Sequence, residues 1–137
     1  MDTEKKVKRM REVELLVVGA GPAGLGAAIE ASRYGVKVLL VDDKDKPGGQ
    51  LFKQIHKFFG SKEHLAGIRG FDIGSHLLKE AESQGVEISL QTKVLGIMEK
   101  DVISLLVKER ELKSIKAKRI ILATGGIEKA LSFPEWT

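Results

Sequence analysis

The sequence predicts an α/β fold in which helices cover a mainly parallel β-sheet. Residues 13–18 and 36–41 are short runs rich in Val and Leu that are apolar on both faces, as the covered strands of a parallel sheet are. An alanine-rich stretch of helical length separates the two runs. Strand, helix and strand in this order form a βαβ unit, for which a right-handed crossover is expected.

The stretch between the two runs carries the start and stop signals of a helix. Pro22 fits the first turn, where its missing N–H costs nothing, and Gly35 fits the position just past the end. Alanines favour this helix and let it lie close to the sheet: Ala23, Ala27, Ala28 and Ala31.

The rest of the chain returns to the same sheet. Residues 44–70 are irregular, and we expect a loop there with one short helix at most. A second helix is predicted from about Phe71 to Gln84, with Gly85 as its stop, followed by a strand over 86–91. Its apolar stripe consists of Ile73, Leu77, Leu78 and Ala81.

A small antiparallel meander is predicted over residues 94–117. Three strand-like runs follow one another there, separated by charged pairs at hairpin spacing. Residues 119–126, RIILATGG, return to the buried-strand type and end in small residues.

Composition narrows the function. The chain has 137 residues, of which 42 % are hydrophobic and 31 % charged, which is ordinary for one soluble domain. It has no cysteine, so disulfides, thiolate nucleophiles and cysteine-ligated metals are excluded. No apolar run is long enough to cross a bilayer, and no signal peptide is recognisable, so we expect a cytoplasmic protein without membrane contact.

The net charge of +4 does not predict nucleic-acid binding, because it is concentrated at one end. Residues 1–11 hold five Lys or Arg against two Asp or Glu, and the remainder is nearly balanced. We interpret residues 1–11 as a basic N-terminal extension and residues 12–137 as the folded domain. A functional basic arm is the alternative.

Three glycines follow the first strand and open the first helix. In this G-x-G-x-x-G pattern Gly19 makes the tight turn, Gly21 lets a ligand approach the backbone, and Gly24 permits close packing of helix and strand. The helix amino terminus offers unpaired N–H groups and the positive end of its dipole to a pyrophosphate. The pattern predicts a Rossmann-like dinucleotide-binding fold.

A carboxylate stands at the end of the next strand. Asp42 follows Gly19 by 23 positions and can accept hydrogen bonds from the ribose of an adenosine, with Asp43 as the adjacent candidate. A negative charge there disfavours a 2′-phosphate and so disfavours NADP. The alternative is a glycine-rich turn with a capping aspartate and no ligand.

Other polar residues do not form a recognisable site. The segment 67–74, GIRGFDIG, follows no apolar strand and has a different glycine spacing. His56, His64 and His76 lack metal-ligand spacing, and we interpret them as surface or packing residues. We therefore predict no metal site and no catalytic side chain.

In order along the chain, VVGAGPAGLGAAIEASRYGVKVLLVDD, PGGQL, the meander and IILATGG resemble the FAD-binding half of the two-dinucleotide-binding-domain flavoproteins. Within that superfamily, the pyridine nucleotide oxidoreductases, the sequence looks most like the thioredoxin-reductase-like flavoproteins and the FAD/NAD-dependent dehydrogenases related to sarcosine and opine oxidase subunits. The resemblance covers about residues 12–136. It implies an FAD/NAD(P)-binding parallel sheet with an inserted antiparallel meander, and FAD as the cofactor, with NAD less favoured.

The resemblance also implies roles for individual residues. The glycine loop would bind the pyrophosphate, Asp42 the ribose, the backbone of Val94 the adenine, and the PGGQL segment the ribityl and flavin portion. Three small residues at the end of the meander would close over the cofactor, namely Ala123, Thr124 and Gly125. The cofactor-binding residues are Gly19, Ala20, Gly21, Pro22, Ala23, Gly24, Asp42, Asp43, Gly48, Gly49, Gln50, Leu51, Val94, Ala123, Thr124 and Gly125.

Three departures from the family pattern shape the functional prediction. The sequence has no redox cysteines, no second glycine fingerprint after Gly126 and no later Gly-Asp turn for the flavin. We expect a fold that is incomplete at its C-terminus and a chain that acts as a fragment or subunit of an FAD-dependent oxidoreductase. A homo-oligomer or a partner subunit would complete it. The alternative is a non-catalytic module that recognises FAD, NAD or ADP.

Overall fold

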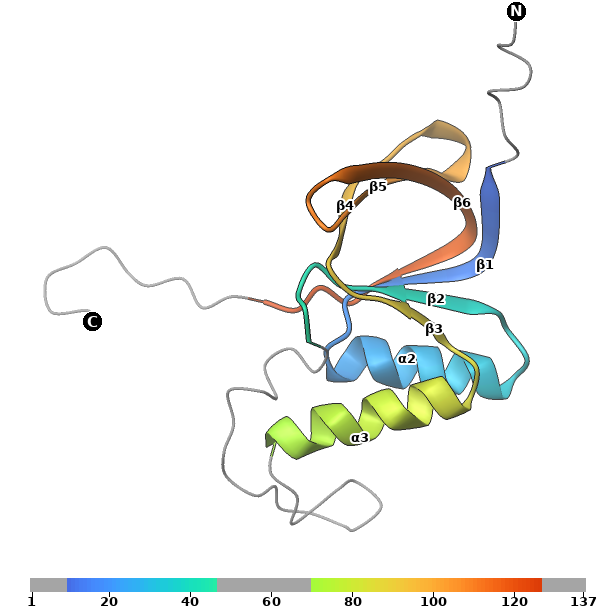
Figure 1. Ribbon diagram of the computed structural model, residues 1–137. Helices are drawn as coiled ribbons and strands as arrows, with labels where there is room; N and C mark the ends of the chain where they lie inside the picture. Colours follow the sequence, from blue (N-terminus) through green and yellow to red (C-terminus); the bar gives the residue numbers. More distant parts are fainter. Residues whose placement is uncertain (1–9, 47–69, 127–137) are drawn as a thin grey trace, which may run out of the picture.

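The computed structural model describes residues 10–46 and 70–126, which form one sheet flanked by two helices (Figure 1). Six strands are present in this part of the chain, in the order β3-β2-β1-β6-β5-β4. The strands are β1 (Arg11–Val18), β2 (Val38–Val41), β3 (Glu87–Ser89), β4 (Thr92–Ile97), β5 (Val102–Val107) and β6 (Glu111–Leu122). The helices are α2 (Pro22–Arg33) and α3 (Gly70–Ser83), with a short 3-10 turn, η3 (Glu99–Asp101), between β4 and β5.

The sheet is parallel in one half and antiparallel in the other. Strands β3, β2, β1 and β6 pair in parallel, and β6, β5 and β4 pair antiparallel. The predicted α/β class, the parallel sheet and the inserted meander are confirmed. Gly35 and Gly85 follow the two helices with φ of +82° and +86°, at the predicted helix ends.

The two helices lie side by side along one face of the parallel strands (Figure 1). Leu15 and Val17 of β1 point to this face, and Leu40 of β2 joins them. The helices meet them with Leu25, Ala28 and Ile29 of α2 and Ala81 of α3. The small Ala28 and Gly24 are buried, so α2 can lie close against the sheet.

The meander covers the opposite face. Because side chains alternate along a strand, Leu16 of β1 and Leu39 of β2 point away from the helices. They pack against Ile103 and Leu105 of β5 and Ile115 of β6. Strands β1 and β2 are thus covered on both faces, as their apolar sequences indicated.

The last two predicted strand runs are one strand in the structure. Strand β6 continues from Glu111 to Leu122, pairing with β5 up to Lys116 and with β1 from Ile115 onward. The separate buried strand expected at 119–126 is therefore wrong. Ile121 and Leu122 at the end of this strand are 38 % and 64 % exposed, and β5 pairs with β6 only as far as Lys116.

The connection between β3 and β4 also differs from the prediction. Strand β3 ends at Ser89, and β4 begins at Thr92, two residues before the expected start of the meander. Gln91 has φ of +50°, which ends the extended backbone between the two strands.

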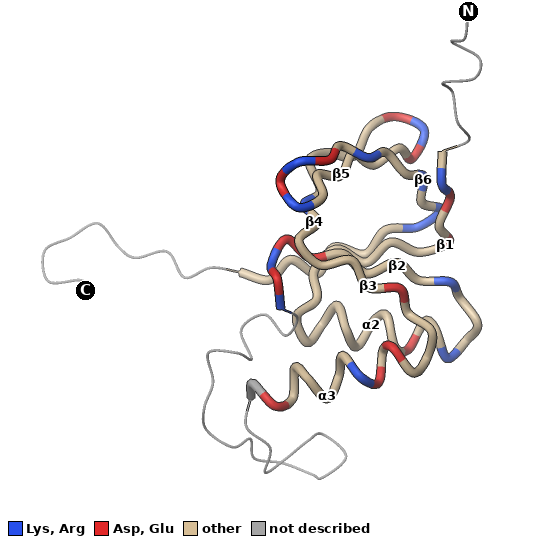
Figure 2. The backbone as a smooth tube through the Cα atoms, in the orientation of Figure 1, with Lys and Arg blue, Asp and Glu red and all other residues tan. Residues whose placement is uncertain are grey.

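Charged residues are frequent in the loop after β2 and in the turns of the meander, while β2 and β5 contain none (Figure 2). Across residues 10–46 and 70–126, the helices are too short or too polar to span a membrane.

Candidate dinucleotide-binding site

The glycine loop joins the carboxyl end of β1 to α2 and packs against the end of β6. Gly19 has φ of +111° and donates its N–H to the Val41 carbonyl oxygen at 2.8 Å. A Cβ atom on Gly19 would lie 2.1 Å from the carbonyl oxygen of Ala123. Only glycine fits here, because the chain after β6 passes directly over this turn.

Gly24 lies where α2 packs directly against the glycine loop at the end of β1. A Cβ atom on Gly24 would lie 1.7 Å from the carbonyl oxygen of Gly19. The first turn of α2 is therefore held against the glycine loop, as expected for the third glycine of this pattern.

The amino terminus of α2 is suited to an anion. Gly21 is the N-cap residue and Pro22 begins the helix. Among the described residues no side chain caps this end, and the first turn contains no acidic residue. The N–H groups and the positive end of the helix dipole therefore have no competing negative charge from this turn.

Asp42 follows β2 directly, and its carboxylate reaches the glycine loop. Its Oδ2 accepts a hydrogen bond from the Ala20 N–H at 2.7 Å, and its Oδ1 accepts one from the Lys44 N–H at 2.8 Å. Each carboxylate oxygen can accept a further hydrogen bond, as ribose hydroxyls would supply. Asp43 is exposed beside it.

A cavity of about 330 Å³ opens where β1, β2 and β6 end. Ligands of open α/β sheets bind at this carboxyl edge. The cavity brings together five predicted site residues, namely Gly19, Asp42, Asp43, Val94 and Thr124. Four further residues line it: Val18, Thr92, Lys93 and Leu122. The lining thus includes two carboxylates and one ammonium group.

The other predicted residues lie around this cavity or outside the described part of the chain. Ala20 is buried and holds Asp42, whereas Pro22 and Ala23 are exposed in the first turn of α2. Ala123 donates its N–H to the Val18 carbonyl oxygen at 2.7 Å, and Gly125 is exposed with φ of +73°. The predicted residues outside the described ranges are Gly48, Gly49, Gln50 and Leu51.

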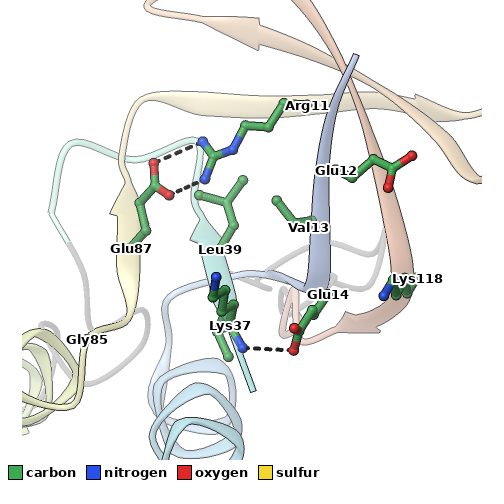
Figure 3. Close-up of a pocket in the computed structure, with 10 residues that line it drawn as sticks. Arg11, Glu12, Val13, Glu14, Lys37, Leu39, Gly85, Glu87 and Lys118 are labelled. Carbon is green, nitrogen blue, oxygen red and sulfur yellow. Dashed lines mark hydrogen bonds and ion pairs between the residues drawn. The ribbon is translucent and has the colours of Figure 1, made fainter. Parts of the chain in front are cut away.

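A larger cavity, of about 510 Å³, lies at the opposite edge of the parallel strands (Figure 3). Arg11 on β1 forms an ion pair with Glu87 on β3 across it, and the Lys37 N–H donates to the Glu14 carboxylate. The hydrogen bonds from Arg11 lower the pKa of Glu87, and the same bonds raise the pKa of Arg11. This cavity lies at the amino ends of β1 and β2, so we do not assign the dinucleotide to it.

Of the three histidines interpreted as surface or packing residues, His76 is exposed on α3. His56 and His64 lie outside the described residues. No group of three or more potential metal-ligating side chains gathers within residues 10–46 and 70–126.

Sequence reasoning missed Thr92, Lys93, Val18 and Leu122 as lining residues. Their common signal is position, because each lies at or next to the cavity end of a strand. Local patterns in a sequence do not say which strand ends become neighbours, since that depends on the strand order.

Comparison with known proteins identifies the family. A family model described as pyridine nucleotide-disulphide oxidoreductase matches residues 13–136. The chain belongs to this family. The match spans the glycine loop, Asp42, the meander and the end of β6, and it confirms the predicted resemblance.

Two curated relatives are parts of larger enzymes. An opine oxidase subunit from Rhizobium meliloti (strain 1021) is 26 % identical over 124 residues, which cover 90 % of this chain and 27 % of the relative. The alpha subunit of sarcosine oxidase from Corynebacterium sp. (strain U-96) is 32 % identical over 135 residues, covering 88 % of this chain and 13 % of the relative.

A solved structure shows the same fold. The L-proline dehydrogenase from P. horikoshii superimposes with a TM-score of 0.75 at 26 % identity, covering 90 % of this chain and 25 % of that one. The chain spans about a quarter of the length of the first curated relatives that it matches.

Family membership supports FAD as the cofactor. The described residues fit the adenosine diphosphate half of this cofactor. Gly19 and Gly24 leave the loop without side chains, the amino terminus of α2 suits a pyrophosphate, and Asp42 presents a carboxylate beside it.

Proposed function

We propose that this chain binds the ADP portion of FAD as part of an FAD-dependent oxidoreductase. The observation that carries the proposal is the carboxylate of Asp42, which is held 2.7 Å from the Ala20 N–H, next to the amino terminus of α2. An anion-binding helix end and a ribose-binding carboxylate then lie side by side, as the pyrophosphate and ribose of an adenosine diphosphate do.

The chain's residues would bind and orient the cofactor. The N–H groups of the glycine loop bind the pyrophosphate, Asp42 accepts hydrogen bonds from the ribose, and the adenine lies along Val94. Asp43 adds negative charge beside the ribose, which disfavours a 2′-phosphate. Ala123, Thr124 and Gly125 lie next to the pyrophosphate, because Ala123 contacts Gly19.

FAD supplies the redox chemistry when it is bound, by accepting electrons from a donor. From the family resemblance we assign Gly48, Gly49, Gln50 and Leu51 to its ribityl and flavin portion. Residues of this chain therefore position the cofactor, and no side chain here is assigned a role in a substrate reaction.

We also propose that the complete enzyme contains more protein than this chain, either as further residues or as a partner subunit. The support is the quarter-length coverage of relatives that are themselves named as subunits. Sarcosine and L-proline, named in two of the similar proteins, are both secondary amines. An amino acid with a secondary amine is accordingly our proposed donor class for the complete enzyme.

A binding experiment tests the proposed function. Calorimetric titration of the 137-residue chain should rank FAD and NAD above NADP. Asp42→Ala should weaken FAD binding by about ten- to a hundredfold, because a hydrogen bond to a charged group contributes about 1.5–3 kcal/mol. The matched control is Asp45→Ala, which removes the same charge from the same loop but does not line the cavity, and should change the affinity less than about twofold.

Two results would contradict the assignment: equal affinity for NAD and NADP, or equal effects of the two aspartate variants. A chain that binds ADP and NAD but does not retain FAD would favour the alternative, a dinucleotide-binding module without redox function. Retention of FAD after co-expression with the remaining residues of the enzyme would support the role as one part of an oxidoreductase.

A further inference from the structure

Thr92 is the one buried polar side chain among the residues that the structure describes, with 2 % of its surface exposed. Its hydroxyl donates to the Leu90 carbonyl oxygen at 3.0 Å and lies 2.8 Å from the Ser89 hydroxyl. A hydroxyl has one proton, so the Ser89 hydroxyl is the donor in the second bond. The two hydroxyl groups therefore tie together the turn that joins β3 to β4.

This turn holds the backbone of Asp42 on both sides. The Thr92 N–H donates to the Asp42 carbonyl oxygen at 2.8 Å, and the Asp42 N–H donates to the Ser89 carbonyl oxygen at 3.1 Å. A third bond runs from the Gln91 N–H to the Lys44 carbonyl oxygen at 2.9 Å. The residue that carries the proposed ribose-binding carboxylate is thus fixed by residues 89–92.

The turn has a conformation that needs such support. Gln91 has φ of +50°, a left-handed conformation that residues other than glycine adopt only when surrounding interactions hold them there. The hydrogen bonds of the Thr92 hydroxyl reach across this residue to Leu90 and Ser89. Removing them would leave the Ser89 hydroxyl and the Leu90 carbonyl oxygen without these partners.

We propose that Thr92 is a positioning residue for dinucleotide recognition. Through Ser89 and the backbone of Asp42, its hydroxyl holds the carboxylate beside the Ala20 N–H, where it can receive the ribose hydroxyls. The inference rests on the proposed function of Asp42. It assigns to Thr92 a selectivity for ribose, although Thr92 itself would not need to touch the ligand.

Two nucleotides that differ by one hydroxyl test this role. Wild-type protein should bind ADP about tenfold or more tightly than 2′-deoxy-ADP, because the deoxy ligand lacks a donor to Asp42. In Thr92→Val, which keeps the shape and removes the hydroxyl, this ratio should fall below about threefold. Thr92→Ser, which restores a hydroxyl, should recover most of the ratio.

The ratio separates positioning from general stability. Loss of folded protein alone would lower the affinity for both nucleotides by the same factor and leave the ratio unchanged. Thermal melting of each variant verifies that it is folded at the titration temperature. If Thr92→Val does not fold, Ser89→Ala tests the positioning role in its place. This variant removes the partner hydroxyl from a partly buried position and should also lower the ratio of the two affinities.

The inference fails if Thr92→Val folds and keeps the wild-type ratio of the two affinities. If Thr92→Val does not fold, the inference fails when folded Ser89→Ala keeps that ratio. Wild-type protein that binds no ADP overturns the proposed function and this inference with it. Wild-type protein that binds both nucleotides equally refutes the ribose assignment of Asp42. Failure of Thr92 alone is recognised by a normal wild-type ratio that the variants do not change.

Discussion

Two glycines of α2 have opposite requirements for space, which gives a sharp test of the site's packing. Gly24 and Gly26 lie two residues apart in the same helix. A Cβ atom on Gly24 would stand 1.7 Å from the Gly19 carbonyl oxygen, whereas one on Gly26 would have no neighbour within 4 Å. Both replacements by alanine add the same methyl group, so their difference isolates the contact with the glycine loop.

The two alanine variants should change stability in opposite directions. Alanine in a helix interior is favoured over glycine by roughly 0.5–1 kcal/mol, and Gly26→Ala should gain about this amount. In Gly24→Ala the helix must move away from the loop by more than an ångström. Inserting a group into a packed interior costs typically 1–3 kcal/mol and occasionally more. We expect the packing cost in Gly24→Ala to lie towards the upper end of that range. After the helix preference of alanine is subtracted, the variant should lower the free energy of unfolding by about 2 kcal/mol.

Thermal and urea unfolding of the two variants measures this difference. For a domain of this size 1 kcal/mol corresponds to a shift of about 3–4 °C in Tm, so Gly24→Ala should melt about 6 °C below wild type. Gly26→Ala should melt about 2–3 °C above wild type. If both variants have the same Tm, the close packing of α2 on the glycine loop is not present in solution, and the geometry of the proposed site is wrong.

Two further variants test the binding loop and the ion pair at the opposite edge. Gly21→Val should leave the fold largely intact, because φ of −76° suits any residue. It should abolish the FAD-dependent rise in Tm of the wild type, for which FAD at a hundredfold excess over Kd supplies about 2.7 kcal/mol of stabilisation. An unchanged rise would remove the loop from the site. Glu87→Gln should lower stability at pH 7 by less than about 1 kcal/mol, because its ion pair with Arg11 is half exposed and screened by water. The pKa of Glu87 is lowered, so this contribution is present above the ordinary glutamate pKa and is lost as pH falls through the lowered value. The Tm difference between variant and wild type should therefore shrink as the pH is brought below the ordinary glutamate pKa.

The parts of the fold that local signals determine were predictable from the sequence. Pro22 and Gly35 mark the two ends of α2, and the apolar runs around residues 13–18 and 36–41 form β1 and β2, which are neighbours in the parallel half of the sheet. Each signal acts over a few residues, through helix capping, φ preference or the two-residue period of a strand. The positions of Gly19 and Asp42 at adjacent strand ends follow from the same βαβ unit.

Features that depend on distant pairing were not predictable. Residues 111–122 contain no local signal that says whether they form one strand or two, and pairing with both β1 and β5 makes them one. The exposure of Leu122 depends on how far β5 extends beside β6. Thr92 became part of the site because the β3–β4 turn folds back onto Asp42, a contact across 50 positions of the chain.

The three glycines of the loop provide different kinds of evidence about function. Gly19 and Gly24 are required by the chain itself, because Cβ atoms there would meet the carbonyl oxygens of Ala123 and Gly19. Their presence would be explained by the fold even if nothing were bound. The φ of Gly21, −76°, is open to any residue, so its backbone conformation does not require glycine, and the glycine pattern predicts that a ligand approaches the backbone there. Variants of Gly19 or Gly24 therefore report on folding, and a claim about FAD binding must be decided at Gly21 and Asp42.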